Sequence, residues 1–133
     1  MVSLSGCKDN EPKYDIYENH NISACGVNDP LINLDWLAEF TANYTSAAIN
    51  LTICLYVNIE TEEENIVMIY RRYTYEENGK LLETIPYPEQ VYSCSGERLF
   101  TDSSGEPTEE WGKFFYSGKN EPREIIWYRI RIN

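Results

Sequence analysis

The strongest pattern along the chain is a strict alternation over residues 49–60. Every odd position from Ile49 to Ile59 carries an aliphatic side chain, and most even positions between them are polar. A period of two predicts a β-strand with one face on a core and the other in water, as in an antiparallel sheet. On this pattern the side chain of Cys54, an even position, belongs to the polar face.

Further short apolar runs predict strands at about 66–75, 81–85, 91–94, 98–100 and 124–132. Asn78-Gly79 lies between two of these runs, and Asn-Gly is a strong hairpin signal. Gly96, in the Ser-Gly-Glu segment after Cys94, marks a second tight hairpin. In the last strand we expect Trp127 on the face opposite Ile126. Residues 102–112 are polar and rich in turn formers, which predicts a loop before a short segment at 113–116.

A helical periodicity begins shortly after residue 30. The positions that recur at helical spacing are Leu34, Leu37, Ala38, Thr41 and Tyr44. Asn28-Asp29-Pro30 supplies a start signal, because a capping side chain is followed by proline in the first turn. We therefore expect one helix at about 31–45. The fold class that follows is α+β, with one N-terminal helix packed on one face of an antiparallel β-sheet of about four to six strands.

Residues 1–24 differ from the rest of the chain. They open on the short apolar run 1–4, turn polar, and show no apolar periodicity around His20. We predict a signal remnant followed by a flexible tether over 1–24, and a single α+β domain over 25–133.

Leu4-Ser5-Gly6-Cys7 resembles a bacterial lipobox, in which an apolar residue and two small residues precede the cysteine that receives a diacylglyceryl chain. The resemblance implies lipidation at Cys7. A complete signal peptide has a basic segment and about 7–15 apolar residues before the cleavage site. Only six residues, none basic, precede Cys7. Either the natural chain begins further upstream, or the match is a coincidence.

Two further segments carry a second resemblance. Cys25 to Leu31 reads CGVNDPL and is followed by LDWL, and residues 91–97 read VYSCSGE. These segments are similar to those of small uncharacterised lipoproteins from gut Gram-negative bacteria. Asp35 stands where those proteins often have proline. The resemblance implies an outer-membrane lipoprotein of the cell envelope, periplasmic or surface-exposed, and it carries no established activity.

Composition and charge narrow the classes of partner. The net charge is −11, and a polyanion repels phosphate backbones, which argues against nucleic acid. No stretch approaches the ~20 apolar residues that span a bilayer. We expect attachment to the membrane through lipid on Cys7, with a protein or a glycan as a further partner.

Candidate chemistry is sparse. His20 is the only histidine and lies in the predicted tether, which argues against a metal site and against histidine-based catalysis. No nucleotide, metalloprotease or nucleophile-elbow motif is present, so we expect no cofactor, no metal and no catalytic residue. A disulfide between two of Cys25, Cys54 and Cys94 is expected in an oxidising compartment, with all three pairings open.

Aromatic residues in the predicted strands suggest a binding surface. Most of them are expected to pack across strands, and some of Tyr56, Tyr70 and Trp127 to form an exposed platform for a glycan or a protein. The leading hypothesis is a lipid-anchored, non-enzymatic binding or protein-interaction domain. An inhibitor or immunity-type protein that docks on a basic enzyme surface is the alternative. A small hydrolase that uses Cys54 or a glutamate ranks last.

Overall fold

A computed structural model describes residues 11–75 and 77–132 of the chain. The helices are α2 (Pro30–Asn33), α3 (Asp35–Asn43) and α4 (Glu109–Tyr116). A small hairpin consists of β2 (Ser23–Ala24) and β3 (Val27–Asn28). The main sheet contains β1 (Tyr14–Glu18), β4 (Ile49–Asn58), β5 (Glu64–Tyr75), β6 (Leu81–Thr84), β7 (Gln90–Tyr92), β8 (Arg98–Leu99) and β9 (Asn120–Arg131). Cys7 and the rest of the lipobox lie outside the described residues.

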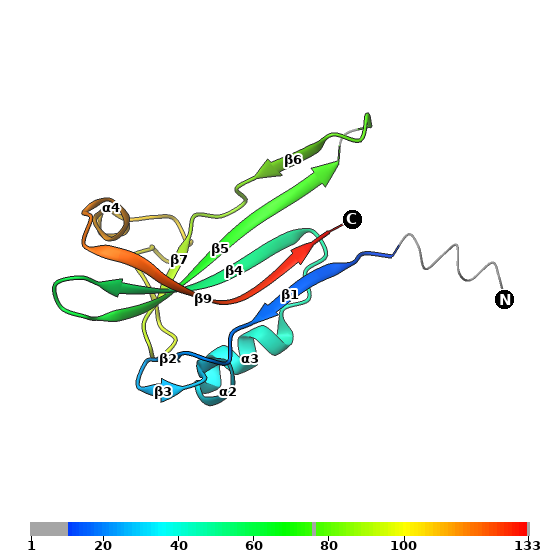
Figure 1. Cartoon of the computed structure of the whole chain (residues 1–133). Coiled ribbons are helices and arrows are strands. Elements are labelled where there is room, and N and C mark those ends of the chain that lie inside the picture. The colour runs from blue at the N-terminus through cyan, green and yellow to red at the C-terminus, as the bar shows by residue number, and fades with distance from the viewer. Residues whose placement is uncertain (1–10, 76, 133) are drawn as a thin grey trace.

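The fold mixes helices with a seven-stranded sheet in the order β1-β9-β4-β5-β7-β8, with β6 paired to β5. Every pairing between the described strands is antiparallel. Helices α2 and α3 lie on one face of the sheet, and α4 lies on the other (Figure 1). The α+β class and the antiparallel sheet are as predicted, whereas the sheet has more strands than the four to six expected.

Strand β4 lies at the centre of the sheet between β5 and β9, and it is buried on both faces. The odd side chains from Leu51 to Val57 join the main core with Leu37 and Met68, as the alternation predicted, whereas Ile59, beyond the end of the strand, is exposed. The even face is not wet as predicted, because Cys54 is only 7% exposed. The physical reason is α4, whose Phe114 forms a second apolar cluster on that face with Val67 and Val91. A helix starting at Glu109, within the predicted loop, therefore converts the expected wet face into a second small core.

The expected continuous helix over 31–45 is instead two short helices, α2 and α3, divided at Leu34. The backbone of Leu34 is extended, with φ −101° and ψ 96°, so helical hydrogen bonding stops there and begins again. Both Leu31 and Leu37 are buried in the main core. In one straight helix these two residues would point about 120° apart, at about 100° per residue. The break at Leu34 lets both side chains reach the same core.

The flexible tether predicted within residues 1–24 is wrong from residue 14 onwards. Strand β1 pairs with β9 along its whole length, from Tyr14 opposite Arg131 to Glu18 opposite Trp127. The ring of Tyr17 stacks on Tyr128 at 5.3 Å. An edge strand gains backbone hydrogen bonds from a single neighbour and needs no buried face of its own. For that reason its sequence shows no strong alternation, and the pattern along the chain did not reveal it.

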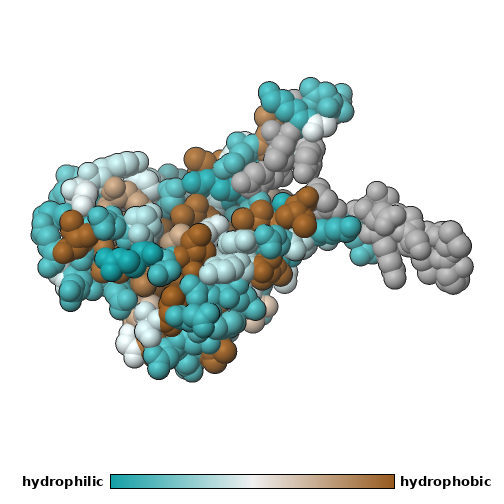
Figure 2. Space-filling model, in the orientation of Figure 1, coloured by the Kyte–Doolittle hydropathy of each residue, from teal (hydrophilic) through white to brown (hydrophobic). Residues whose placement is uncertain are grey.

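The surface has no single large apolar area on the side seen in Figure 2. Hydrophobic side chains along β1 and β9 alternate there with hydrophilic ones, and the exposed isoleucines on these strands include Ile16 and Ile125. Isolated exposed apolar residues are ordinary on folded proteins. No helix within the described ranges is long and apolar enough to cross a membrane.

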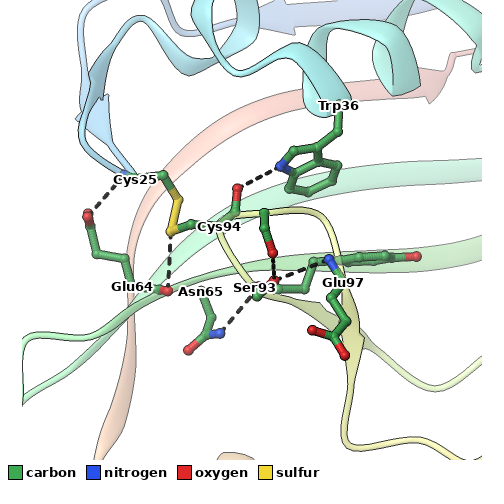
Figure 3. Close-up of a disulfide and its surroundings, with 9 residues drawn as sticks. Cys25, Trp36, Glu64, Asn65, Ser93, Cys94 and Glu97 are labelled. Carbon is green, nitrogen blue, oxygen red and sulfur yellow. Dashed lines mark hydrogen bonds between the residues drawn. A yellow bond between two sulfur atoms is a disulfide. The ribbon is translucent and has the colours of Figure 1, made fainter.

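A disulfide and a tryptophan join the helical layer to the β7–β8 hairpin. Cys25, in the β2–β3 turn, is bonded to Cys94, in the loop after β7, across 69 residues of sequence. This is one of the three pairings that the sequence left open. Trp36 on α3 donates its indole N–H to the carbonyl oxygen of Cys94 at 2.8 Å (Figure 3). The same indole ring stacks on Tyr92 of β7 at 5.5 Å.

Gly96 is required by the close approach of Trp36. Its φ is +91°, and a Cβ added there would lie 2.8 Å from Cγ of the indole ring, inside van der Waals contact. Gly26, in the β2–β3 turn, also has a positive φ of +77°, but an added Cβ would meet nothing within 4 Å. A substitution at Gly26 therefore tests backbone strain alone, whereas one at Gly96 tests strain together with steric overlap.

Replacement of Gly96 by alanine is expected to destabilise the fold more than replacement of Gly26. Both changes place a Cβ in the left-handed region, at about 1–2 kcal/mol. Only Gly96→Ala adds overlap with a packed ring, at about a further 1–3 kcal/mol. Urea unfolding followed by circular dichroism measures both losses. Equal losses in the two variants would show that Trp36 does not press against this loop.

Candidate functional site

The residues considered for catalysis do not come together. Cys54 is free and buried, and burial raises the pKa of its thiol. A buried thiol kept in its protonated form is a poor nucleophile. Glu109 and Glu110 are exposed on the first turn of α4, where both contact Lys113. The hydrolase hypothesis thus finds no gathered set of groups at these positions.

The expected aromatic surface of Tyr56, Tyr70 and Trp127 does not exist as a unit. Trp127 is only 4% exposed, which corrects the prediction that it faces outward. The pairing of β4 with β9 shifts register between Ile53 and Cys54, so that Ile53 faces Trp127 while Cys54 faces Ile125. The irregularity leaves Ile126 as an extra residue, and both Ile126 and Trp127 turn into the main core.

Tyr56 and Tyr70 lie on opposite faces of the sheet. Tyr56 packs against Phe114 and Phe115 of α4, with ring centroids 5.8 Å and 5.9 Å away. It is therefore part of the second apolar cluster. Tyr70 is the one residue of the predicted surface that lies in an open cavity, on the face covered by α3.

That cavity, which we call the aromatic cleft, has a volume of about 630 Å³. It lies between the end of α3, the strands β5 and β7, and the loops around residues 86–88 and 104–106. Its aromatic lining consists of Phe40, Tyr44, Tyr70, Tyr87 and Tyr92. Pockets of about 300–1,000 Å³ with aromatic walls and a few polar groups are typical of small-ligand sites.

The tyrosine walls hold one another in place. Tyr70 contacts Tyr44 at 6.5 Å and meets Tyr87 edge to face at 5.5 Å, measured between ring centroids. The hydroxyl of Tyr44 donates to the carbonyl oxygen of Ile49 at 2.7 Å. Burial raises the pKa of Tyr44, Tyr70 and Tyr92, so their hydroxyls stay protonated near neutral pH. The cleft thus presents neutral aromatic rings.

Two loops form the open side of the cleft. Tyr87 lies at a bend between Pro86 and Pro88, whose rings restrict the backbone of this segment. In the second loop the carboxylate of Asp102 accepts from the hydroxyl and the backbone N–H of Ser104, and from the backbone N–H of Glu106. These bonds lower the pKa of Asp102 and hold the turn that places Ser104 and Glu106 at the rim.

Gln90 is the most unusual polar residue of the cleft, because its side chain is buried and only half satisfied. Gln90 is 7% exposed and lies opposite Met68 in the β5–β7 pairing, which directs it to the face that carries the cleft. Its Nε2 donates to the carbonyl oxygen of Pro88 at 2.9 Å. Its Oε1 is buried with no hydrogen-bond partner. An unsatisfied buried acceptor costs about 1–3 kcal/mol. Among the described residues, Nδ2 of Asn50 and Oγ1 of Thr101 are also buried without a partner, but neither residue lines the cleft.

The charged groups of the lining are one cation and one anion. Arg98 and Glu106 both lie at the rim, and the guanidinium of Arg98 donates to the carbonyl oxygen of Asp102 at 3.3 Å. The arrangement offers flat stacking surfaces, one unpaired acceptor and a rim whose single positive and single negative charge offset each other. This is the chemistry of recognition through shape and hydrogen bonding.

A second cavity of about 690 Å³ is polar and of another kind. Glu62, Glu64, Glu124 and Arg123 line it at the end of β4. Glu64 is already engaged there, since its Oε1 accepts from the backbone N–H of Cys25 at 3.0 Å. Within residues 11–75 and 77–132 no group of three or more His, Cys, Asp or Glu side chains is arranged to hold a metal ion.

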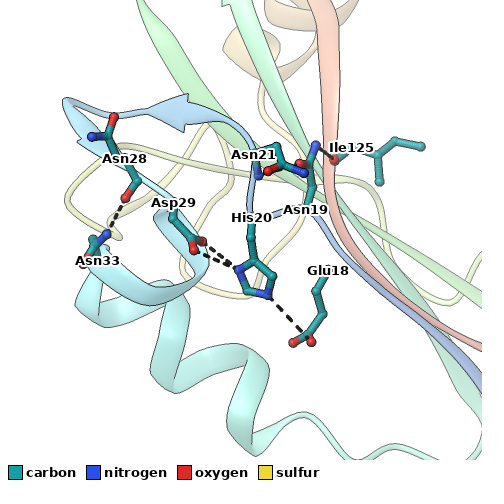
Figure 4. Close-up of polar contacts among 8 residues, drawn as sticks. All are labelled: Glu18, Asn19, His20, Asn21, Asn28, Asp29, Asn33 and Ile125. Carbon is teal, nitrogen blue, oxygen red and sulfur yellow. Dashed lines mark hydrogen bonds and ion pairs between the residues drawn. The ribbon is translucent and has the colours of Figure 1, made fainter.

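His20 is not in a tether but in an ordered polar cluster where β1 leads toward α2 (Figure 4). Its Nδ1 lies 2.9 Å from both carboxylate oxygens of Asp29, and its Nε2 lies 3.8 Å from Glu18. The bond to Asp29, with a smaller contribution from Glu18, raises the pKa of His20. With two carboxylates beside an exposed imidazole, the cluster links the edge strand to the start of α2.

Of the residues that line the cleft, the sequence analysis named only Tyr70 as part of a candidate surface. Tyr87 had one local signal, its position between two prolines, which marks a rigid exposed loop. Gln90 had none, because nothing in the chain indicates that a polar residue next to Val91 is buried. Tyr44 belongs to the helical stripe that was expected to pack on the sheet, and Phe40 was not singled out.

Comparisons with protein-family models, with characterised proteins and with solved structures find no match to this chain.

The His20 cluster predicts a pH-dependent contribution to stability. Because the folded pKa of His20 is raised, its contribution is complete below the unfolded value of about 6.5 and is lost as the pH rises through the folded value. The urea midpoint of the wild type should therefore be higher than that of His20→Gln, and this difference should be larger at about pH 5.5 than at about pH 8.5. Asn21→Gln, on the neighbouring residue, serves as the control. A difference between wild type and His20→Gln that does not change with pH would contradict this role.

Proposed function

We propose that this chain is the binding domain of an exported, lipid-anchored protein of a Gram-negative cell envelope, and that it acts by binding rather than by catalysis. The aromatic cleft is the proposed ligand site. The single observation that carries this proposal is Gln90, whose buried Oε1 lacks a partner beside aromatic walls. Burial of an unpaired acceptor destabilises the fold, so its presence in a ligand-sized cleft favours a function in recognition.

The proposed anchor is Cys7, supported by the lipobox-like Leu-Ser-Gly-Cys segment. The disulfide between Cys25 and Cys94 fits the same hypothesis, since disulfides persist in oxidising compartments such as the periplasm and the cell surface. The sequence between Cys7 and β1 is short and polar. A domain anchored in this way would present its ligand site close to the membrane surface.

The alternative is an inhibitor or immunity-type protein that docks on a basic enzyme. The net charge of −11 favours this function, because opposite charge accelerates association with a basic surface. Such docking would depend strongly on salt and would involve exposed carboxylates. Binding in the aromatic cleft would depend weakly on salt, which separates the two functions.

The ligand site is tested by mapping amide shifts of the ¹⁵N-labelled protein against four classes of probe. The probes are neutral methyl glycosides, the methyl glycoside of galacturonic acid with a free carboxylate as a charged sugar, tetramethylammonium chloride and a proline-rich decapeptide. We expect at least one class to shift the amides of Tyr87, Glu89 and Gln90 in a saturable way. Loss of these shifts in Tyr87→Ala, with no loss in Tyr116→Ala, would assign them to the cleft. If no class shifts these amides, the proposal fails.

The anchor is tested on the natural gene, expressed with its upstream region in a Gram-negative host. We expect the intact mass to match a chain that begins at Cys7 and carries a diacylglyceryl group on the sulfur. Cys7→Ala should abolish the modification and release the protein from the membrane fraction, whereas Cys54→Ala should change neither. A mature wild-type chain with an unmodified Cys7 would end the lipoprotein hypothesis.

A further inference from the structure

The walls of the aromatic cleft suit a ligand that has a flat apolar face. The ring face of a tyrosine is electron-rich, so it attracts C–H groups that carry a slight positive charge. Tyr87 is the most accessible of the walls, at 48% exposed, and it meets Tyr70 edge to face. A ligand that stacks on Tyr87 would lie against Tyr70 as well.

The buried acceptor of the cleft restricts the ligand further. Oε1 of Gln90 has no donor among the described residues, and Nε2 is fixed by Pro88, so the carboxamide cannot turn over without losing that bond. Oε1 is covered in this structure. A ligand in the cleft would therefore satisfy it only by supplying an O–H or N–H donor and by a shift of the side chains that cover it. A quaternary ammonium group carries no such donor. A proline-rich segment lacks N–H groups at its prolines, so neither class satisfies Gln90.

The charges around the cleft favour a neutral ligand. Arg98 and Glu106 balance one another at the rim, and the floor residue Gln90 is uncharged. An anionic ligand would also meet the repulsion of a protein with net charge −11. A cationic ligand would be attracted by the net charge and by Glu106 but repelled at the rim by Arg98. Neither sign of charge is favoured by the groups that line the cleft.

We propose that the aromatic cleft binds a neutral pyranose sugar, with the apolar face of the ring stacked on Tyr87 and a ring hydroxyl donating to Oε1 of Gln90. This inference rests on the proposed function and names its ligand class. A chair-form pyranose combines an apolar C–H face with hydroxyl donors at its edge, which is the pair of features that the walls and the floor require. Arg98, Ser104 and Glu106 at the rim can bond the remaining hydroxyls. Because the cleft opens to solvent at Tyr87, the ring can be the end of a longer glycan.

The test titrates the full chain with the methyl glycosides of glucose, galactose, mannose, xylose and N-acetylglucosamine, followed by ¹⁵N amide shifts. We expect at least one sugar to shift the amides of Tyr87 and Gln90. Tyr87→Ala should weaken its binding about tenfold, and Tyr87→Phe, which keeps the ring, should bind nearly as well as the wild type. Gln90→Leu should weaken binding roughly three- to tenfold through loss of one hydrogen bond.

Tyr116→Ala is the matched control, since Tyr116 is an 80% exposed tyrosine on α4, on the other face of the sheet. Thermal unfolding of each variant checks that it is folded. If Gln90→Leu does not fold, the two Tyr87 variants still test the inference.

If no sugar shifts the cleft amides, or if Tyr87→Ala leaves binding unchanged, the inference is overturned. Binding of the decapeptide or of tetramethylammonium in place of sugars overturns it while the proposed binding function stands. Absence of all binding in the cleft overturns both.

Discussion

The contact between Trp36 and the loop after β7 is the interaction on which the cleft depends. Helix α3 is short, and its indole is bonded to the backbone of Cys94 and stacked on Tyr92. Gly96 permits this approach because it has no Cβ, and the disulfide to Cys25 holds the loop to the β2–β3 turn. Together these ties set the position of α3 relative to β7. The space that remains between the end of the helix and the strand is the aromatic cleft.

The sheet can leave a cleft open on one face because β4 is buried on both. The main core under α2 and α3 takes the odd side chains of β4, and α4 covers the even side with Phe114. The two clusters are thereby removed from water without closing the region around Tyr70 and Tyr87. Hydrophobic burial stabilises the two clusters, while the cleft keeps partly exposed rings and a buried amide without a full set of partners. Departures of this kind from optimal packing are expected where a protein binds something else.

Elements with strong local patterns were predicted well. The alternation of β4 is set by the two-residue period of any strand, and Asn78-Gly79 marks the β5–β6 turn by its backbone preferences alone. Elements that depend on a partner were missed. Strand β1 exists because β9 offers it an edge, and α4 buries only one residue fully, Phe114, so neither has a clear signal of its own. For the site, Tyr70 was named as a candidate surface aromatic and lines the cleft. The prediction that Trp127 faces outward was wrong, because a register shift turns it inward.

The sequence by itself determined the α+β class, the core face of the central strand, the acidic character of the chain and the lipobox-like segment at Cys7, because these follow from local composition and periodicity. The tertiary structure decided which cysteines pair, where the helix breaks at Leu34, and which aromatic residues share a cleft. The disulfide spans 69 residues, and the cleft assembles side chains from α3, β5, β7 and two loops. Such contacts join parts of the chain that are far apart in sequence, and no pattern with a period of two or of 3.6 residues can encode them. The burial of Gln90 belongs to the same class, since it depends on what covers the residue and not on its neighbours along the chain.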